Sequence, residues 1–104
     1  MEKSRKWGGA LNPSYIVTAT PTLTSGNYFD KTIDTTKKYI LFNDLIQADG
    51  TYRAGAIYID SGVIKSVQNI GDGYITASIT GTTLHVVAPS GATAPRRIML
   101  IQLD

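Results

Sequence analysis

The side chains that could do chemistry are few, and their spacing does not assemble a catalytic motif. His85 is the single histidine, and no carboxylate lies near it in the sequence. We expect it on the polar face of a strand, where a lone histidine is more typical of a surface residue than of a general base or a metal ligand. No serine lies in a Gly-x-Ser-x-Gly sequence, the pattern of the nucleophile elbow. The sequence therefore does not predict nucleophilic catalysis.

The carboxylates are expected mostly at strand ends and turns, where aspartate bonds to nearby backbone. No pair of them has a spacing that indicates the two acids of a glycosidase, and no calcium loop of the Asp-x-Asp-x-Asp-Gly type occurs. The chain has no cysteine, which excludes disulfides and cysteine-based zinc sites. Gly71-Asp72-Gly73 lacks the residues that would complete a phosphate-binding loop. We predict that the protein is not an enzyme and holds no cofactor or metal.

Two kinds of binding remain open. Aromatic residues in or near expected loops could form a platform for a sugar, and these are Tyr28, Phe29, Tyr52 and Tyr74. Their alternative role is ordinary packing at the end of the fold. The basic residues beyond the N-terminus are scattered and matched by acids, and no RNP-like aromatic motif is present. A small nucleic-acid-binding barrel is therefore the weaker hypothesis.

The positive charge of the chain is concentrated at its N-terminus. The formal net charge is +2, and the first six residues hold three basic groups and one acid. The rest of the chain holds equal numbers of basic and acidic groups. We interpret residues 1–13 as a basic arm that docks on a neighbouring surface through Lys3, Arg5, Lys6 and Trp7. The alternative is a solvated tail.

Short strands must position all of these residues. Polar and apolar residues alternate over 74–80 and 83–88 around Gly81-Thr82, which predicts a hairpin with Leu84 and Val86 facing inward. A second hairpin is expected from 54–60 and 63–67. Further strands are expected over residues 14–19, 37–43 and 96–103, with a helical turn over 44–47 and no assignment for 28–36.

These elements predict one all-β domain. A chain of 104 residues forms a single core. Seven to eight short strands separated by turns are typical of an antiparallel β-sandwich or a jelly-roll-like barrel, which we expect over residues 14–104. No apolar run approaches the length of a membrane span, so no membrane partner is expected.

Two expected strands are apolar on both faces, at 39–42 and 98–101. Because a single-core sandwich buries one face of each sheet, the second face needs a cover. The cover is either a second subunit or the chain's own residues, namely the arm or the segment 20–36. The first case predicts a homo-oligomer whose interface contains Tyr39, Leu41, Met99 and Ile101.

The run from Tyr74 to Val87 resembles the Thr- and Ser-rich hairpins of virion structural proteins of tailed bacteriophages, and residues 96–103 are similar to their closing strands. The family includes capsid decoration proteins, tail appendages and receptor-binding domains. The resemblance covers the last third of the chain and implies a β-sandwich, multimeric packing and no catalysis.

From these observations we expect a non-enzymatic virion structural protein, made in the host cytoplasm. The leading hypothesis is a capsid auxiliary or decoration subunit, whose partners are other capsid or tail proteins and not nucleic acid. The alternative is a tail or fibre head domain that binds a host-surface glycan.

Overall fold

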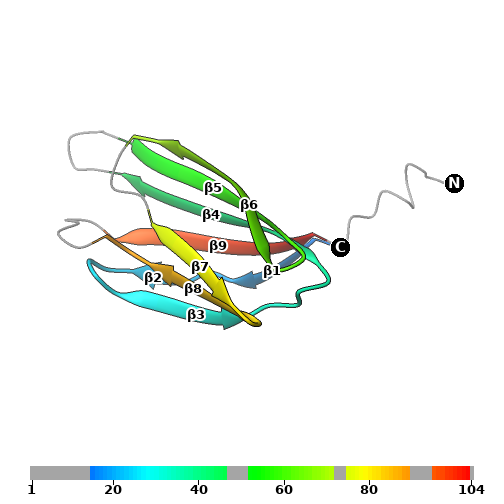
Figure 1. The fold of residues 1–104 in the computed structure, drawn as a ribbon. Helices are drawn as coiled ribbons and strands as arrows, with labels where there is room; N and C mark the ends of the chain where they lie inside the picture. Colours follow the sequence, from blue (N-terminus) through cyan, green and yellow to red (C-terminus); the bar gives the residue numbers. More distant parts are fainter. Residues whose placement is uncertain (1–14, 47–51, 72–74, 90–94, 104) are drawn as a thin grey trace, which may run out of the picture.

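The structure is a computed structural model and describes residues 15–46, 52–71, 75–89 and 95–103. Within these ranges it has nine strands and no helix. The strands are β1 (Ile16–Ala19), β2 (Thr22–Leu23), β3 (Tyr28–Thr32), β4 (Lys38–Ile46), β5 (Tyr52–Asp60), β6 (Val63–Ile70), β7 (Thr76–Thr80), β8 (Thr83–Val87) and β9 (Arg96–Leu103). They form two sheets packed face to face, so the expected β-sandwich is confirmed (Figure 1).

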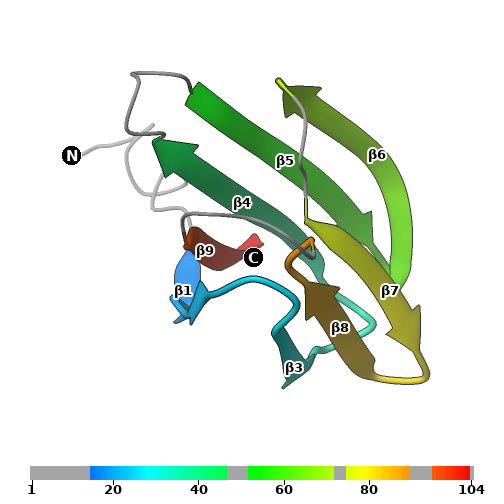
Figure 2. The same cartoon turned by 90° about the vertical axis from the view of Figure 1, so that its left-hand side faces the viewer.

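The two sheets differ in size. The large sheet has the order β1-β9-β4-β5-β6, and β2 also pairs with β9. The small sheet has the order β3-β8-β7 and covers one face of the large sheet (Figure 2). All strand pairs are antiparallel. One face of the large sheet therefore has no layer of described residues over it.

The two expected hairpins are present, and their turns have the required backbone. Ser61 and Gly62 join β5 to β6 with φ values of 54° and 77°, the two positive angles of a type I′ turn. Gly81, with a φ of 60°, opens the turn between β7 and β8. These turns place each pair of strands in register from Asp60 opposite Val63 and from Thr80 opposite Thr83.

The core lies between the sheets and is made by alternate residues of each strand. The expected inward residues of β8, Leu84 and Val86, are completely buried. Leu41, Ile59 and Leu100 of the large sheet are buried to the same degree. The other buried apolar residues are Leu23, Ile33, Tyr39, Ile57, Ile75, Ala88 and Ile98.

The expected elements are corrected at four places. The helical turn expected over 44–47 is wrong, because β4 continues to Ile46 and keeps its pairing with β5. Pairing with β5 satisfies backbone groups of these residues without a helix. The unassigned segment 28–36 begins with β3, and β2 adds a further short strand, so the count exceeds the expected seven to eight. The strand expected over 63–67 extends to Ile70.

Strand β6 is the outermost strand on one side of the large sheet, among the residues that the structure describes. Val67 lies on its inner face, opposite the core residue Ile57, yet 48% of its surface is exposed. Ile70 is 67% exposed. The small sheet therefore covers the middle of the large sheet better than this edge.

Candidate functional site

Strands β4 and β9 bury one face and expose the other. Tyr39 and Leu41 face the core and are 3% and 0% exposed. The expectation that these two lie at a subunit interface is therefore corrected, because the chain's own small sheet already covers them. Met99 points to the opposite face, where it is 41% exposed, and Ile101 lies on the same side. For these two the expected interface stays a prediction.

The outward residues of the central strands form rows across the large sheet. Paired residues on one face lie side by side and contact each other. In one row, Ile101 of β9 pairs with Val17 and with Ile40. In the next row, Met99 pairs with Phe42. We call the following residues the outer apolar face: Val17, Ile40, Phe42, Tyr58, Met99 and Ile101.

Half of the outer apolar face is strongly exposed. Val17 is 55% exposed, and Phe42 is 42% exposed, close to the value for Met99. The other three side chains are half-buried by their neighbours in the sheet. Sequence reasoning found the two-faced strands but not Val17 or Tyr58, because their place in these rows depends on the strand order.

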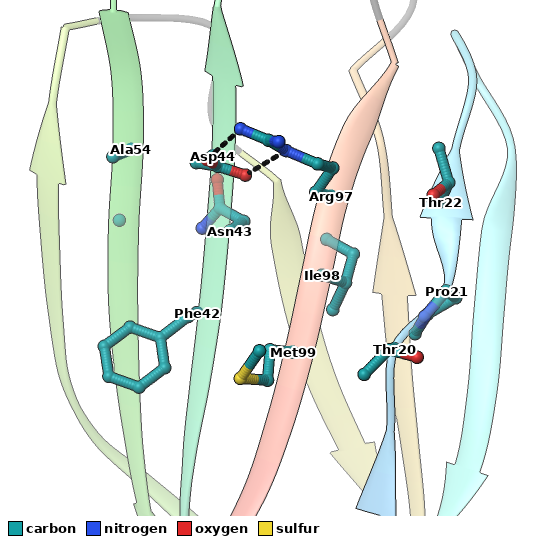
Figure 3. A pocket seen from close by; sticks show the side chains of 11 residues that line it. Thr20, Pro21, Thr22, Phe42, Asn43, Asp44, Ala54, Arg97, Ile98 and Met99 are labelled. Carbon is teal, nitrogen blue, oxygen red and sulfur yellow. Dashed lines mark hydrogen bonds and ion pairs between the residues drawn. The ribbon is translucent and has the colours of Figure 1, made fainter. Parts of the chain in front are cut away.

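A depression of about 630 Å³ lies beside Phe42 and Met99 (Figure 3). One side is formed by the link between β1 and β2, which contains Pro21. The full lining is Thr20, Pro21, Thr22, Phe42, Asn43, Asp44, Ala54, Gly55, Arg97, Ile98 and Met99. The depression is open, mostly apolar and has one ion pair beside it, which suits an apolar side chain that carries one polar group.

That ion pair joins Asp44 of β4 to Arg97 of β9, which are register partners. Nε of Arg97 donates to Oδ1 of Asp44 at 2.9 Å, and Nη2 donates to Oδ2 at 2.5 Å. This bidentate geometry raises the pKa of Arg97 above its usual value, through the hydrogen bond first and the charge of Asp44 second. The two charges compensate each other, so the depression has no net charge from this pair.

A polar cluster lies on the outer face of the small sheet. Nδ1 of His85 lies 2.5 Å from Oδ1 of Asp30, its register partner. The ring of Tyr28 lies beside the imidazole, with centroids 5.2 Å apart, and Tyr28 is 63% exposed. His85 lies on the outer face, as expected. Its carboxylate partner Asp30 could not be predicted from the sequence, because 55 residues separate the two. Phe29 faces the other way and packs against the core, so it does not join Tyr28 in a platform.

Ser78 pairs with His85 from the other side, so Asp30, His85 and Ser78 form one row. These are the residue types of a nucleophilic triad. No hydrogen bond joins Ser78 to His85 within the described residues, and both His85 and Asp30 have side chains nearly half exposed. The row does not line the depression beside Phe42 and Met99. The arrangement therefore offers a surface for hydrogen bonding rather than an activated nucleophile.

A second depression of about 380 Å³ is lined by Thr18, Lys31, Thr32, Ile33, Asp34, Tyr39 and Gln102. Four of its polar side chains, those of Thr18, Asp34, Tyr39 and Gln102, form hydrogen bonds within the fold. Oη of Tyr39 accepts from the backbone N–H of Asp34 at 2.8 Å and donates to Oε1 of Gln102 at 3.3 Å. Asp34 accepts from the hydroxyl and backbone N–H of Thr36, and the hydroxyl bond lowers the pKa of Asp34 most strongly. We assign this region a structural role.

Asn43, Gly55 and Asn69 follow one another across β4, β5 and β6 on the inner face. Asn43 is 4% exposed, and its Nδ2 has no hydrogen-bond partner among the described residues. A Cβ added to Gly55 would lie 2.5 Å from Oδ1 of Asn69 and 3.0 Å from Nδ2 of Asn43. The absence of a side chain at Gly55 therefore makes room for both amides.

Several predicted site residues lie outside the described residues. These are Lys3, Arg5, Lys6 and Trp7 of the arm, together with Tyr74 and the side chain of Tyr52. Their roles stay predictions. Among the residues that the structure describes, no three His, Cys, Asp or Glu side chains gather in a way that would hold a metal ion.

The described part of the chain contains no helix long and apolar enough to cross a membrane. Comparisons of the chain with protein-family models, with curated proteins and with solved structures gave no significant match.

Proposed function

We propose that this chain is a non-enzymatic structural subunit that assembles through the outer apolar face of its large sheet. The observation that carries the proposal is the pair Phe42 and Met99, which lie side by side and are 42% and 41% exposed in the centre of that sheet. An antiparallel sheet that faces water has polar outward residues, and contiguous exposed apolar residues indicate an interaction surface.

The composition of this face supports a protein partner. Aromatic residues, methionine and arginine are enriched at protein interfaces, and the region contains Phe42, Tyr58, Met99 and Arg97. Its charged pair is internally compensated, so two copies can approach without repulsion. We therefore take a second copy of the chain as the first partner.

The resemblance to virion structural proteins supports a place in a phage particle, as an auxiliary or decoration subunit of the capsid. In this proposal the outer apolar face binds neighbouring subunits, and the basic arm adds a second contact. Binding of the purified chain to capsid shells that lack it would support the proposal. Binding to tail structures alone would place the subunit there instead.

The assembly proposal is tested by the solution mass of three full-length proteins. The wild-type chain is expected to form a defined oligomer in light scattering, and Met99→Glu is expected to shift it towards monomer. Val67→Glu is the matched control, because Val67 is exposed to a similar degree on the opposite face of the same sheet. A wild-type monomer at all concentrations contradicts the proposal, as does equal dissociation by both substitutions.

The cluster of Tyr28, His85 and Asp30 favours a second candidate function, the binding of a glycan. An exposed tyrosine ring can pack against the apolar face of a sugar, while the adjacent His85 and Asp30 can bond to its hydroxyls. Saturable binding on a glycan array, lost in Tyr28→Ala and kept in Tyr15→Ala, is the expected result. Tyr15 is a suitable control because it is 65% exposed and lies outside this cluster. Equal binding by both variants would remove this candidate.

A further inference from the structure

The depression beside Phe42 and Met99 has the size and chemistry to hold one large aromatic side chain. Its volume of about 630 Å³ lies within the roughly 300–1,000 Å³ of ligand-sized pockets. The chain has a single tryptophan, Trp7, which lies in the segment before the described residues. An indole would bring an apolar body and one N–H donor, which needs an acceptor when it is buried.

The ion pair beside the depression can serve that donor. Each carboxylate oxygen of Asp44 accepts one bond from Arg97, and a carboxylate has about four lone-pair positions in total. The planar guanidinium of Arg97 can also stack on an aromatic ring. Gly8 and Gly9 follow Trp7 directly and carry no side chain, so the backbone next to the indole can approach the sheet closely.

The direction of β1 decides which copy supplies the tryptophan. Ile16 lies opposite Gln102, whereas the depression is lined by Arg97 and Met99, roughly 10–17 Å farther along β9 at about 3.4 Å per residue. Strand β1 begins opposite Gln102 and runs towards β2, which pairs with β9 at Arg97 (Figure 1). It therefore begins at the end away from the depression and runs towards it. To reach its own depression, the arm would have to reverse its direction before β1.

The length of the arm leaves little spare reach for that reversal. Trp7 lies nine residues before Ile16, which corresponds to roughly 30 Å when extended. A β-turn uses about four residues, which leaves a reach of only about 17 Å. That reach covers the near limit of the separation with about 7 Å to spare and the far limit with none. An arm that continues away from β1 needs no turn and extends towards a neighbour.

We propose that Trp7 of one copy fills the depression of a second copy, so that the N-terminal arms are exchanged between subunits. This inference rests on the proposed assembly through the outer apolar face, and it identifies the segment that covers the centre of that face.

The first test uses Trp7 as the only intrinsic tryptophan reporter. The expected result is a blue-shifted emission that is protected from acrylamide at high concentration and becomes exposed on dilution, in parallel with the loss of oligomer. An oligomer in which Trp7 stays quenchable overturns the inference and leaves the assembly proposal intact. A monomer with a protected Trp7 shows that the arm covers its own subunit, which overturns both.

The second test is complementation between two full-length variants. Trp7→Ala keeps the depression but lacks the fluorophore, and Met99→Glu keeps Trp7 but places a charge in the depression. The emission of Met99→Glu alone is expected to be that of exposed tryptophan. Mixing it with excess Trp7→Ala is expected to restore the blue shift, because Trp7 then enters the intact depression of the other variant. Unchanged emission after mixing overturns the exchange. Val67→Glu is the control, and its Trp7 should be protected without mixing.

Discussion

Leu41 and Phe42 are adjacent in β4, yet Leu41 is completely buried in the core whereas 42% of Phe42 is exposed on the outer apolar face. Their substitution by alanine should therefore separate folding from assembly. Leu41→Ala is expected to lower the free energy of unfolding by about 2–5 kcal/mol, because it leaves a cavity between the sheets. Phe42→Ala should cost less than about 1.5 kcal/mol in the monomer and should weaken the oligomer.

Denaturant titration of dilute protein measures the free energy of unfolding, and light scattering of concentrated protein measures the oligomeric state. If Phe42→Ala destabilised the dilute protein as much as Leu41→Ala, the outer face would already be covered within one chain.

Gly55→Ala should destabilise the fold. The new Cβ would lie 2.5 Å from Oδ1 of Asn69 and 3.0 Å from the backbone oxygen of Gln68. The Asn69 side chain can move because it is exposed, but the strand backbone of β6 must also shift. We expect a loss of about 1–3 kcal/mol in the free energy of unfolding, measured by denaturant titration. The double variant Gly55→Ala, Asn69→Ala should recover part of this loss, and an unchanged loss would place the strain on the backbone of β6.

Acid should weaken the turn that precedes β4. The pKa of Asp34 is lowered below its usual value of 3.8, chiefly because its carboxylate accepts the hydroxyl hydrogen bond of Thr36. A carboxylate whose pKa is lower in the folded state than in the unfolded state stabilises the fold. This contribution is fully present when the pH is above the pKa of the unfolded state, and it is lost as the pH falls through the pKa of the folded state. The midpoint temperature of thermal unfolding should therefore decrease as the pH is lowered below about 4, and the protonation of Asp34 should account for part of this decrease.

Asp34→Asn removes the titratable group. The midpoint temperature of thermal unfolding of this variant should therefore depend less steeply on pH below about pH 4 than that of the wild type. Asp60→Asn is the control, at a half-buried aspartate at the end of β5 that accepts a hydrogen bond from the hydroxyl of Ser61. A steeper acid dependence in Asp34→Asn than in the wild type would contradict the assignment.

The Asp44–Arg97 pair should matter more to assembly than to folding. Arg97 has a side chain 61% exposed, so water and salt screen the pair in the monomer. Arg97→Ala should leave the monomer's unfolding midpoint nearly unchanged. At an interface the loss of Arg97 would leave Asp44 unpaired and buried, so the dissociation constant should rise at least tenfold. Sedimentation over a concentration series measures it, and a fully unchanged constant would place the pair outside the contact.

Local patterns predicted much of the fold. The alternation over 83–88 identified Leu84 and Val86 as core residues, and the turn residues at 61–62 and 81–82 identified both hairpins. The prediction of a helical turn over 44–47 is wrong because the pairing of residues 44–46 with β5 overrides a weak local preference. Residues 28–32 carried too little local pattern for an assignment, and their pairing with β8 makes them a strand.

The candidate site was less predictable, because it depends on strand order. Apolar residues at consecutive positions of 39–42 and 98–101 indicate that one apolar face of each strand lies outside the core. They do not indicate which of these residues face the core. The prediction that Tyr39 and Leu41 lie at a subunit interface is therefore wrong, because both face the core. The partnerships of Asp44 with Arg97 and of Asp30 with His85 join residues more than fifty positions apart, and no spacing rule reaches that distance.

The first and last strands, β1 and β9, are antiparallel neighbours, with Ile16 opposite Gln102. A pulling force applied at residues 15 and 103 would therefore act at one end of a single ladder. It would open the hydrogen bonds one after another, as in a zipper, rather than load them together in shear. A subunit tethered by both of these residues would yield at β1 under small forces, while the hairpins of β4–β5–β6 and β7–β8 carried no load.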